Sequence, residues 1–526
     1  MTTAADERRD AEFGEGLIAA LGFLALAVVN LILWPIDYPP LVDLPNHLAR
    51  HAIQCDPAIG LGRYYDYGFV WVPNLTAELI HALPMACASL LTTQKVLIQL
   101  ASTGLLASVL VLHFAVWRRW SVWPLLAAFA SHHMAFAYGF ENYMLAMPPV
   151  LLVLAVWFTM AGCGPVARLL AMVPLAGAVY VLHVYAFAFL FGAIALLEAG
   201  FWWRGRGRVS GFPLRAVLVS CVAIGPALHL FVVAAGTAGI EPGATELGGL
   251  LRRLTVALSP FTALGQPYLD PGVLRVAALQ LVAMAMIWGI ARARFGVAIR
   301  DGTAIALWGL LAVSLVVPAN FAGVALTDIR FPALVVCLLM AFSDVRLSRA
   351  GAVVVTVVVV AAALGRTVWL ESRWAQHDGE VRELLAAGAV LTPDDRMLVA
   401  RTGLGWDVLL HSHSAAHLAR EVGLFIPDIF SGGNALTATG AYAARDAFQP
   451  YPLEVARLIA EAEAPRRDGR DVMRWQERYW ADWPAFYTHV LVLGAPGRPV
   501  PDIPELGEVV AIGSFFAIYE TGSVAN

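Results

Sequence analysis

The chain has 526 residues, of which 59% are hydrophobic and only 14% are charged, and its formal net charge is −4. A soluble domain carries about 25% charged residues, so this composition predicts an integral membrane protein. A net charge so close to neutral argues against a nucleic-acid partner. The cysteines show no paired or metal-binding spacing, so we interpret them as packing residues and not as a disulfide framework: Cys55, Cys87, Cys163, Cys221 and Cys337.

Apolar runs recur through the first two thirds of the chain, and a membrane-spanning helix needs about 20 such residues. We predict eleven spanning segments, at about 17–35, 94–117, 122–138, 144–161, 168–183, 185–203, 213–234, 272–292, 302–323, 332–345 and 349–369. Residues 75–91 are also apolar, but Glu78, His81 and Pro84 interrupt them, so we expect a helix that lies in the membrane interface. Residues 246–261 predict a second amphipathic helix of this kind.

Arginines gather in alternate loops between these segments, at 118–119, 168, 204–208, 292–300 and 346–349. Cytoplasmic loops are enriched in basic residues, so we expect these loops and the N-terminus to be cytoplasmic. The opposite side then receives residues 36–93, 139–143, 235–271, 324–331 and everything after about 370. Basic charge is almost entirely arginine, which favours a high-GC bacterium and, for this chain, its inner membrane.

The character of the chain changes near residue 372. We predict a transmembrane domain over 1–372 and a small α/β or α+β domain over 373–526, outside the cytoplasm. Short apolar runs at 396–400, 489–494 and 515–520 indicate strands, and 451–464 and 471–483 indicate helices. The histidine-rich stretch "HSHSAAHLAR" (411–420) favours the start of a surface helix with a serine cap.

The stretch "LVDLPNHLARH" follows the first apolar segment. Asp43 and Pro45 predict a helix start, with Asp43 as N-cap and Pro45 in the first turn. Asp43, His47, and Arg50 or His51 then share one helical face, which we expect to line a wet hollow at the membrane surface. The alternative is that Asp43 only caps the helix while the histidines and Arg50 reach the lipid headgroups.

Similar residues recur in two later outer turns. "GFENY" contains Glu141 and Asn142, and "LTDIRFP" contains Asp328 and Arg330. Ionisable residues at membrane depth are costly and commonly mark a site, so we expect these turns to converge on one pocket. Two structural alternatives stay open, in which Arg330 pairs with Asp328 or with Glu141.

This arrangement resembles the membrane-embedded C-type glycosyltransferases (GT-C superfamily), through "DLPNHL" and, more weakly, "GFENY" and "DIRFP". "DLPNHL" is similar to an Asp-x-Pro-x-His-Leu motif of uncharacterised bacterial members. The resemblance implies a polytopic helical fold with interfacial helices in the first outer loop, and a sugar donor linked to a polyprenyl phosphate. It also implies that Asp43 is the catalytic base or a metal-anchoring carboxylate.

Inverting sugar transfer of this kind needs a base for the acceptor hydroxyl and positive charge for the departing phosphate. Asp43 is the candidate base, and Arg330, then Arg252 or Arg253, are the candidate phosphate ligands. We place the remaining predicted substrate-binding residues around them: His47, Arg50, His51, Glu141, Asn142 and Asp328. A divalent metal such as Mg²⁺ or Mn²⁺, held by Asp43, His47 and His51, is an open alternative.

The expected function is therefore sugar transfer from a polyprenyl-phosphate donor to a glycan, glycolipid or protein acceptor of the cell envelope. Two other classes remain open. A transporter or flippase of a lipid-linked or anionic substrate would place polar residues near the membrane midplane, often within repeats. A non-catalytic envelope-assembly protein would act through residues 373–526.

Overall fold

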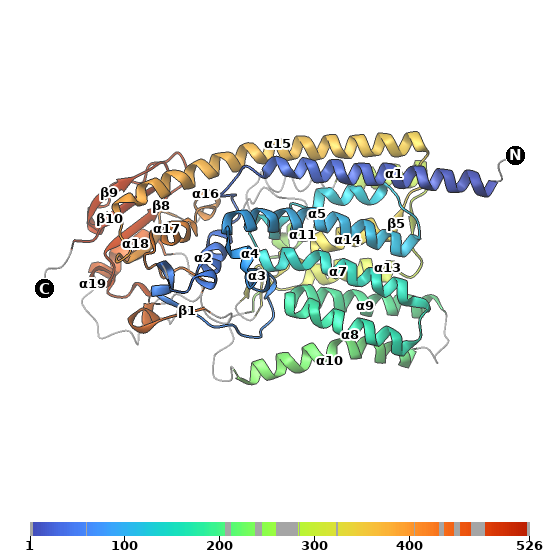
Figure 1. The fold of residues 1–526 in the computed structure, drawn as a ribbon, viewed down its shortest axis with the longest axis horizontal. Coiled ribbons are helices and arrows are strands. Elements are labelled where there is room, and N and C mark those ends of the chain that lie inside the picture. The colour runs from blue at the N-terminus through green and yellow to red at the C-terminus, as the bar shows by residue number, and fades with distance from the viewer. Residues whose placement is uncertain are drawn as a thin grey trace.

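The structure, a computed structural model, describes residues 4–58, 60–205, 212–236, 245–258, 282, 285–321, 324–403, 405–430, 436–445, 453–463 and 479–522. The molecule is elongated: a bundle of helices occupies one end and a domain containing a small sheet occupies the other (Figure 1). Two helices, α1 and α15, run side by side along the long axis of the bundle.

Six helices of the described residues are long and apolar enough to cross a membrane, which supports a multi-pass membrane protein. Five of the predicted segments fall within or largely overlap the first five of these helices, and 349–369 lies within the last. They are α1 (Ala4–Asn30), α5 (Leu90–Trp117), α7 (Glu141–Thr159), α8 (Pro165–Leu182), α9 (Val184–Arg204) and α15 (Arg349–Ala387).

Other predicted spans differ from the expectation. Residues 122–138 do not form one helix: η3 (Trp123–Ala130) is a 3₁₀ helix, and His133 then caps the separate turn α6 (Met134–Ala137). The prediction failed because apolar composition does not distinguish one helix from two short buried pieces. The segments predicted at 302–323 and 332–345 correspond to α13 (Ala304–Val316) and α14 (Pro332–Phe342), which are shorter than a full span. The segment at 213–234, by contrast, does lie within one helix, α10 (Phe212–Gly236). The predicted segment 272–292 lies largely outside the described residues.

Residues 36–93, predicted as the first outer loop and called by that name below, are built from short elements, as expected. After η1 (Leu31–Leu33), which ends the first candidate span, they contain α2 (Leu44–Cys55), η2 (Gly60–Arg63), β1 (Tyr65–Tyr67), α3 (Thr76–His81) and α4 (Pro84–Cys87). Residues 75–91, predicted as one helix in the membrane interface, contain two short helices, α3 and α4, because Pro84 begins a new helix after α3 ends. The amphipathic helix predicted over 246–261 is α11 (Leu250–Leu258).

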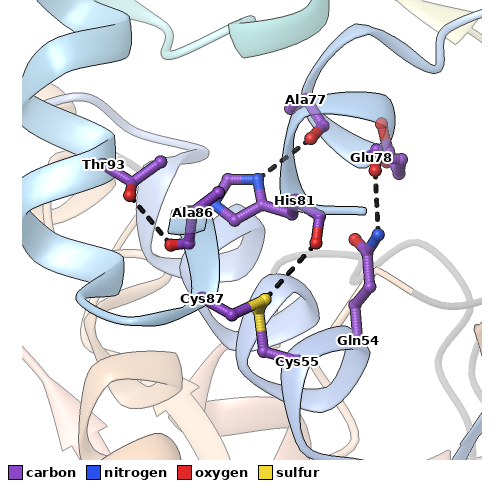
Figure 2. Close-up of a disulfide and its surroundings, with 8 residues drawn as sticks. All are labelled: Gln54, Cys55, Ala77, Glu78, His81, Ala86, Cys87 and Thr93. Carbon is purple, nitrogen blue, oxygen red and sulfur yellow. Dashed lines mark hydrogen bonds between the residues drawn. A yellow bond between two sulfur atoms is a disulfide. The ribbon is translucent and has the colours of Figure 1, made fainter. Parts of the chain in front are cut away.

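One cysteine prediction is wrong. Cys55 at the end of α2 and Cys87 in α4 form a disulfide, with Cα atoms 5.5 Å apart (Figure 2). The two cysteines are separated by 32 residues, and their pairing depends on the packing of α2 against α4, which local spacing does not reveal.

The C-terminal domain contains a four-stranded mixed sheet in the order β6-β8-β10-β9. Strands β6 (Met397–Arg401) and β8 (His489–Leu493) are parallel, and β10 (Phe516–Glu520) is antiparallel to β8 and to β9 (Glu508–Ile512). The predicted strands thus match within one residue at each end, and β9 was missed. Its helices and turns are η7 (Gly388–Val390), α16 (Trp406–Leu409), α17 (Ser414–Val422), η8 (Gly440–Arg445), α18 (Val455–Glu463), α19 (Trp483–Phe486) and η11 (Pro504–Leu506).

Two connections join this domain to the membrane domain. Helix α15 has 39 residues, about 58 Å at 1.5 Å per residue, so it continues unbroken past the expected boundary at residue 372. Strand β1 of the first outer loop pairs antiparallel with β7 (Leu436–Ala438) of the C-terminal domain. The first outer loop and the C-terminal domain therefore share a hydrophobic core.

Two pairs of short antiparallel strands lie in the segments that connect the later helices of the bundle. Strand β2 (Ala298–Ile299) pairs with β5 (Ser343–Asp344), and β3 (Asn320–Phe321) pairs with β4 (Val324–Ala325). A 3₁₀ turn, η6 (Asp328–Arg330), then leads into α14, and η4 (Met160–Gly162) ends α7.

Candidate functional site

The polar residues predicted at the outer face gather around α2. Helix α2 lies between the helix bundle and the C-terminal sheet, next to α3 and α4 (Figure 1). It packs against α3 and α5 on one side and against α17 of the C-terminal domain on the other. His47, Arg50 and His51 are buried in these contacts, so the predicted stripe faces protein and not an open hollow.

Asp43 occupies the predicted N-cap of α2, but its carboxylate makes no capping hydrogen bond. The backbone N–H of Asp43 donates instead to the carbonyl oxygen of Tyr138, at 3.0 Å. Gly139, with φ +72°, packs so closely that an added Cβ would lie 3.1 Å from the Asp43 nitrogen. The α6–α7 turn thus fixes the backbone of Asp43 through contacts that do not involve its carboxylate.

The carboxylate of Asp43 is largely buried, with 18% of the side chain exposed. Its Oδ1 lies 3.7 Å from Nε2 of His413, from the C-terminal domain. Burial raises the pKa of Asp43 to about 7, although the charge of Arg330 acts in the opposite direction. A carboxyl group with this pKa can accept a proton near neutral pH.

Arg330 contacts the same turn through Phe140. Its guanidinium carbon lies 4.2 Å from the ring centre of Phe140 and 4.9 Å from that of Tyr185, and Nη1 lies 3.2 Å from Nε2 of His183. Tyr143 donates a hydrogen bond to the carbonyl oxygen of Arg330. Within the described ranges, no carboxylate lies within 4.0 Å of this guanidinium, so both pairings considered for Arg330 are wrong.

Glu141 pairs with histidines and not with an arginine. Its Oε2 lies 3.0 Å from Nε2 of His51 and 3.8 Å from Nδ1 of His47. The rings of His51 and His81 stack with centres 3.9 Å apart. Burial lowers the pKa of His47 to about 4, despite the opposing charge of Glu141. His47, His51 and Glu141 form a compact cluster, separate from Asp43.

The predicted binding residues Arg50 and Asn142 are occupied by a structural network. Arg50 donates to Glu78 at 2.8 Å, and Asn142 donates to the other Glu78 oxygen at 3.0 Å. The side-chain oxygen of Asn142 accepts from the backbone N–H of Ala77 at 2.6 Å. These contacts tie α2, α3 and α7 together, so we interpret them as the frame of the site.

Asp328, Arg252 and Arg253 lie in a different network. Arg252 forms two hydrogen bonds to Asp328, from Nε at 3.0 Å and from Nη2 at 3.1 Å. Arg253 reaches the carbonyl oxygen of Leu315 in α13 at 3.4 Å. The paired arrangement joins α11 to η6, so it orients the turn that carries Arg330.

Figure 2 shows how the disulfide reinforces this frame. The Cys87 sulfur lies 3.3 Å from the carbonyl oxygen of His81, and Nδ1 of His81 bonds the carbonyl oxygen of Ala77 at 2.9 Å. Gln54 donates to the carbonyl oxygen of Glu78 at 2.8 Å. The histidine cluster is therefore supported by covalent and hydrogen-bonded links between α2, α3 and α4.

Sequence reasoning missed His413, His183 and His81. The predicted surface helix at 411–420 is instead buried: His413 contacts Asp43, and Nε2 of His411 lies 3.0 Å from Oε2 of Glu380 in α15. The predicted serine cap is also absent, because the N-cap residue of α17 is His413 and its side chain makes no capping hydrogen bond. The available signal was the concentration of three histidines in seven residues (411–417).

We compared the chain with known protein families, with curated proteins and with solved structures. No family model, no curated protein and no solved structure matches it. Its function is accordingly inferred from the chemistry of the site.

Proposed function

We propose that this protein is a membrane glycosyltransferase that transfers a sugar from a polyprenyl-phosphate donor to a cell-envelope acceptor. One observation carries the proposal. Asp43 presents a carboxylate free of capping contacts, within the electrostatic influence of Arg330, a buried cation with no carboxylate within 4.0 Å in the described residues. A base within electrostatic reach of a buried cation is the pair that this transfer requires.

Asp43 serves as the general base. It takes the proton of the acceptor hydroxyl as that oxygen forms a bond to the anomeric carbon of the donor sugar. The bond between this carbon and the phosphate oxygen breaks, and polyprenyl phosphate departs with the bonding electrons. A direct displacement of this kind inverts the anomeric configuration.

Arg330 binds the phosphate. Guanidinium groups remain charged and offer paired donors that match phosphate oxygens. Phe140 and Tyr185 hold the guanidinium by cation–π contacts, and its Nε has no hydrogen-bond partner among the described residues, so it can donate to a phosphate oxygen. His183, which lies 3.2 Å from Nη1, restricts its orientation.

The proposed side of action is the outer face of a bacterial inner membrane. Disulfides persist mainly in oxidising compartments, and Cys55–Cys87 lies in the same loop as Asp43. Helix α2 adjoins the end of the bundle where α5 and α14 begin. At the opposite end, where α5 and α14 finish, Arg119 pairs with Asp344, 2.9 Å away. Basic residues at this opposite end agree with a cytoplasmic location for it.

The proposal is tested with purified protein in vesicles, a panel of radiolabelled polyprenyl-phosphate sugars, and envelope lipids and glycans as acceptors. Wild type should transfer label to an acceptor. Asp43→Asn should lower the rate by about 100-fold or more, because removal of a general base has effects of this size. Arg330→Gln should also lower it, chiefly by weakening donor binding.

Asp56→Asn is the matched control, since Asp56 follows α2 and is exposed. Its rate should equal that of wild type. Equal transfer by Asp43→Asn would remove Asp43 from the mechanism. Movement of intact labelled donor across the vesicle without transfer would favour a flippase and contradict the proposal.

A further inference from the structure

Three ligand-type side chains converge beside the proposed catalytic pair. One nitrogen each from His47 and His51 and one oxygen from Glu141 all lie within 4.8 Å of one another. Metal–nitrogen and metal–oxygen bonds of about 2.0–2.2 Å place neighbouring ligand atoms roughly 3–3.6 Å apart. The observed 3.0 Å and 3.8 Å separations from Glu141 Oε2 are close to that range.

Several polar atoms of this cluster lack hydrogen-bond partners. Among the described residues, three such atoms are buried and unpartnered, and the first and last of them can face a shared ion: Nδ1 of His47, Nδ1 of His51 and Oε1 of Glu141. His47 and Glu141 are 8% and 1% exposed, so water does not readily solvate them. Unsatisfied buried polar atoms are costly, and a bound cation would supply the missing interaction.

The positions of these side chains are fixed before any ligand binds. His47 and His51 are four residues apart on α2, a spacing that directs both imidazoles to one side of a helix. Glu141 begins α7, which the Glu78–Asn142 hydrogen bond links to α3. The Cys55–Cys87 disulfide anchors the far end of α2 (Figure 2).

We infer that His47, His51 and Glu141 bind a divalent transition-metal ion. Two imidazoles and one carboxylate suit Zn²⁺, Mn²⁺, Fe²⁺ or Co²⁺ better than Mg²⁺ or Ca²⁺, which prefer all-oxygen ligands. This ligand set differs from the one predicted from sequence, because Glu141 replaces Asp43. The inference does not depend on sugar transfer and holds for any reaction at the neighbouring residues.

Metal binding is tested without any sugar substrate. Protein purified in detergent is stripped with a chelator, incubated separately with Zn²⁺, Mn²⁺ and Co²⁺, desalted, and analysed for metal by mass spectrometry. Wild type should retain about one equivalent of at least one ion, and that ion should raise Tm. Cobalt should add a visible absorption band if it binds to imidazole nitrogen.

His51→Ala and the near-isosteric Glu141→Gln should each lower the retained metal at least tenfold and abolish the rise in Tm. His229→Ala is the control, because His229 pairs with Tyr180 in the helix bundle, away from the cluster. Size-exclusion profiles identify variants that fold. Wild type without retained metal, or folded Glu141→Gln with a full equivalent, would overturn the inference.

Discussion

His413 of the C-terminal domain joins Asn46 and Asp43 of the first outer loop. Its Nδ1 lies 2.7 Å from the amide nitrogen of Asn46, and its Nε2 lies 3.7 Å from Oδ1 of Asp43. Because the Asn46 amide nitrogen only donates, Nδ1 accepts and the ring proton resides on Nε2. Burial lowers the pKa of His413 to about 3, so a neutral ring directs an N–H toward Asp43 at pH 7.

Removing this ring should change the pH dependence of transfer. An N–H directed at a carboxylate favours its charged form, so His413→Ala should raise the pKa of Asp43. The acidic midpoint of the kcat/KM profile should then move upward by up to about one pH unit. His413→Gln, whose amide can donate, should move it less. An unchanged profile in His413→Ala would contradict this role.

Gly139 should be required for the position of Asp43. Its φ of +72° disfavours other residues by about 1–2 kcal/mol, and a Cβ there would lie 3.1 Å from the backbone nitrogens of Asp43 and Leu44. We expect Gly139→Ala to lower both Tm and transfer rate, measured by thermal unfolding and by the vesicle assay. Gly365→Ala, in open space within α15, is the control: alanine favours the helical conformation more than glycine does, so this variant should lower neither Tm nor rate.

The fold was partly predictable because its signals are local. Pro45 and Asp43 correctly predicted the start of α2, and β-branched apolar runs located three of the four strands of the C-terminal sheet. The convergence of Glu141 with the first outer loop was also expected. Each of these predictions depended on a pattern within a few residues or on membrane topology.

The partners within the site were not predictable in the same way. Glu141 meets His51, and Asp328 meets Arg252, because helices distant in sequence pack at particular angles. A single sequence shows which side chains need a partner but not which partner packing supplies. The burial of His413 had the same cause, since α17 packs against α2.

The disulfide should stabilise the first outer loop. Its sequence separation of 32 residues corresponds to about 3–4 kcal/mol in the chain-entropy description. We expect the Cys55→Ser/Cys87→Ser double variant to unfold at a lower temperature than wild type. Cys163→Ser, at an exposed free cysteine, should have the Tm of wild type. Equal Tm for the double variant would show that the bridge has no stabilising role.

Asp428 should make stability depend on pH. It is buried, its Oδ1 lacks a hydrogen-bond partner in the described residues, and burial raises its pKa from 3.8 to about 7 against the charge of Arg401. The folded state therefore binds more protons between these values, and the stability from this group is lost as pH rises through 7. The shift of 7 − 3.8 = 3.2 corresponds to at most about 4 kcal/mol.

Asp428→Asn should consequently be more stable than wild type at pH 8 and equally stable at pH 4. Denaturant unfolding in detergent across this pH range measures the difference. Asp394→Asn is the control, because Asp394 is exposed and pairs with Arg63 at the surface. A variant less stable than wild type at pH 8 would show that the Asp428 carboxylate is satisfied when charged.

In the proposed mechanism, Arg330 binds the phosphate of a lipid-linked donor while Asp43 takes the proton of the acceptor hydroxyl. An experimental structure of the protein with bound polyprenyl phosphate tests it most directly. The phosphate should lie within hydrogen-bond distance of the Arg330 guanidinium, with the Asp43 carboxylate open to the position of the acceptor hydroxyl that receives the sugar. A phosphate bound at the arginine-lined cavity between α5, α8 and α9, with Arg330 uncontacted, would contradict the claim.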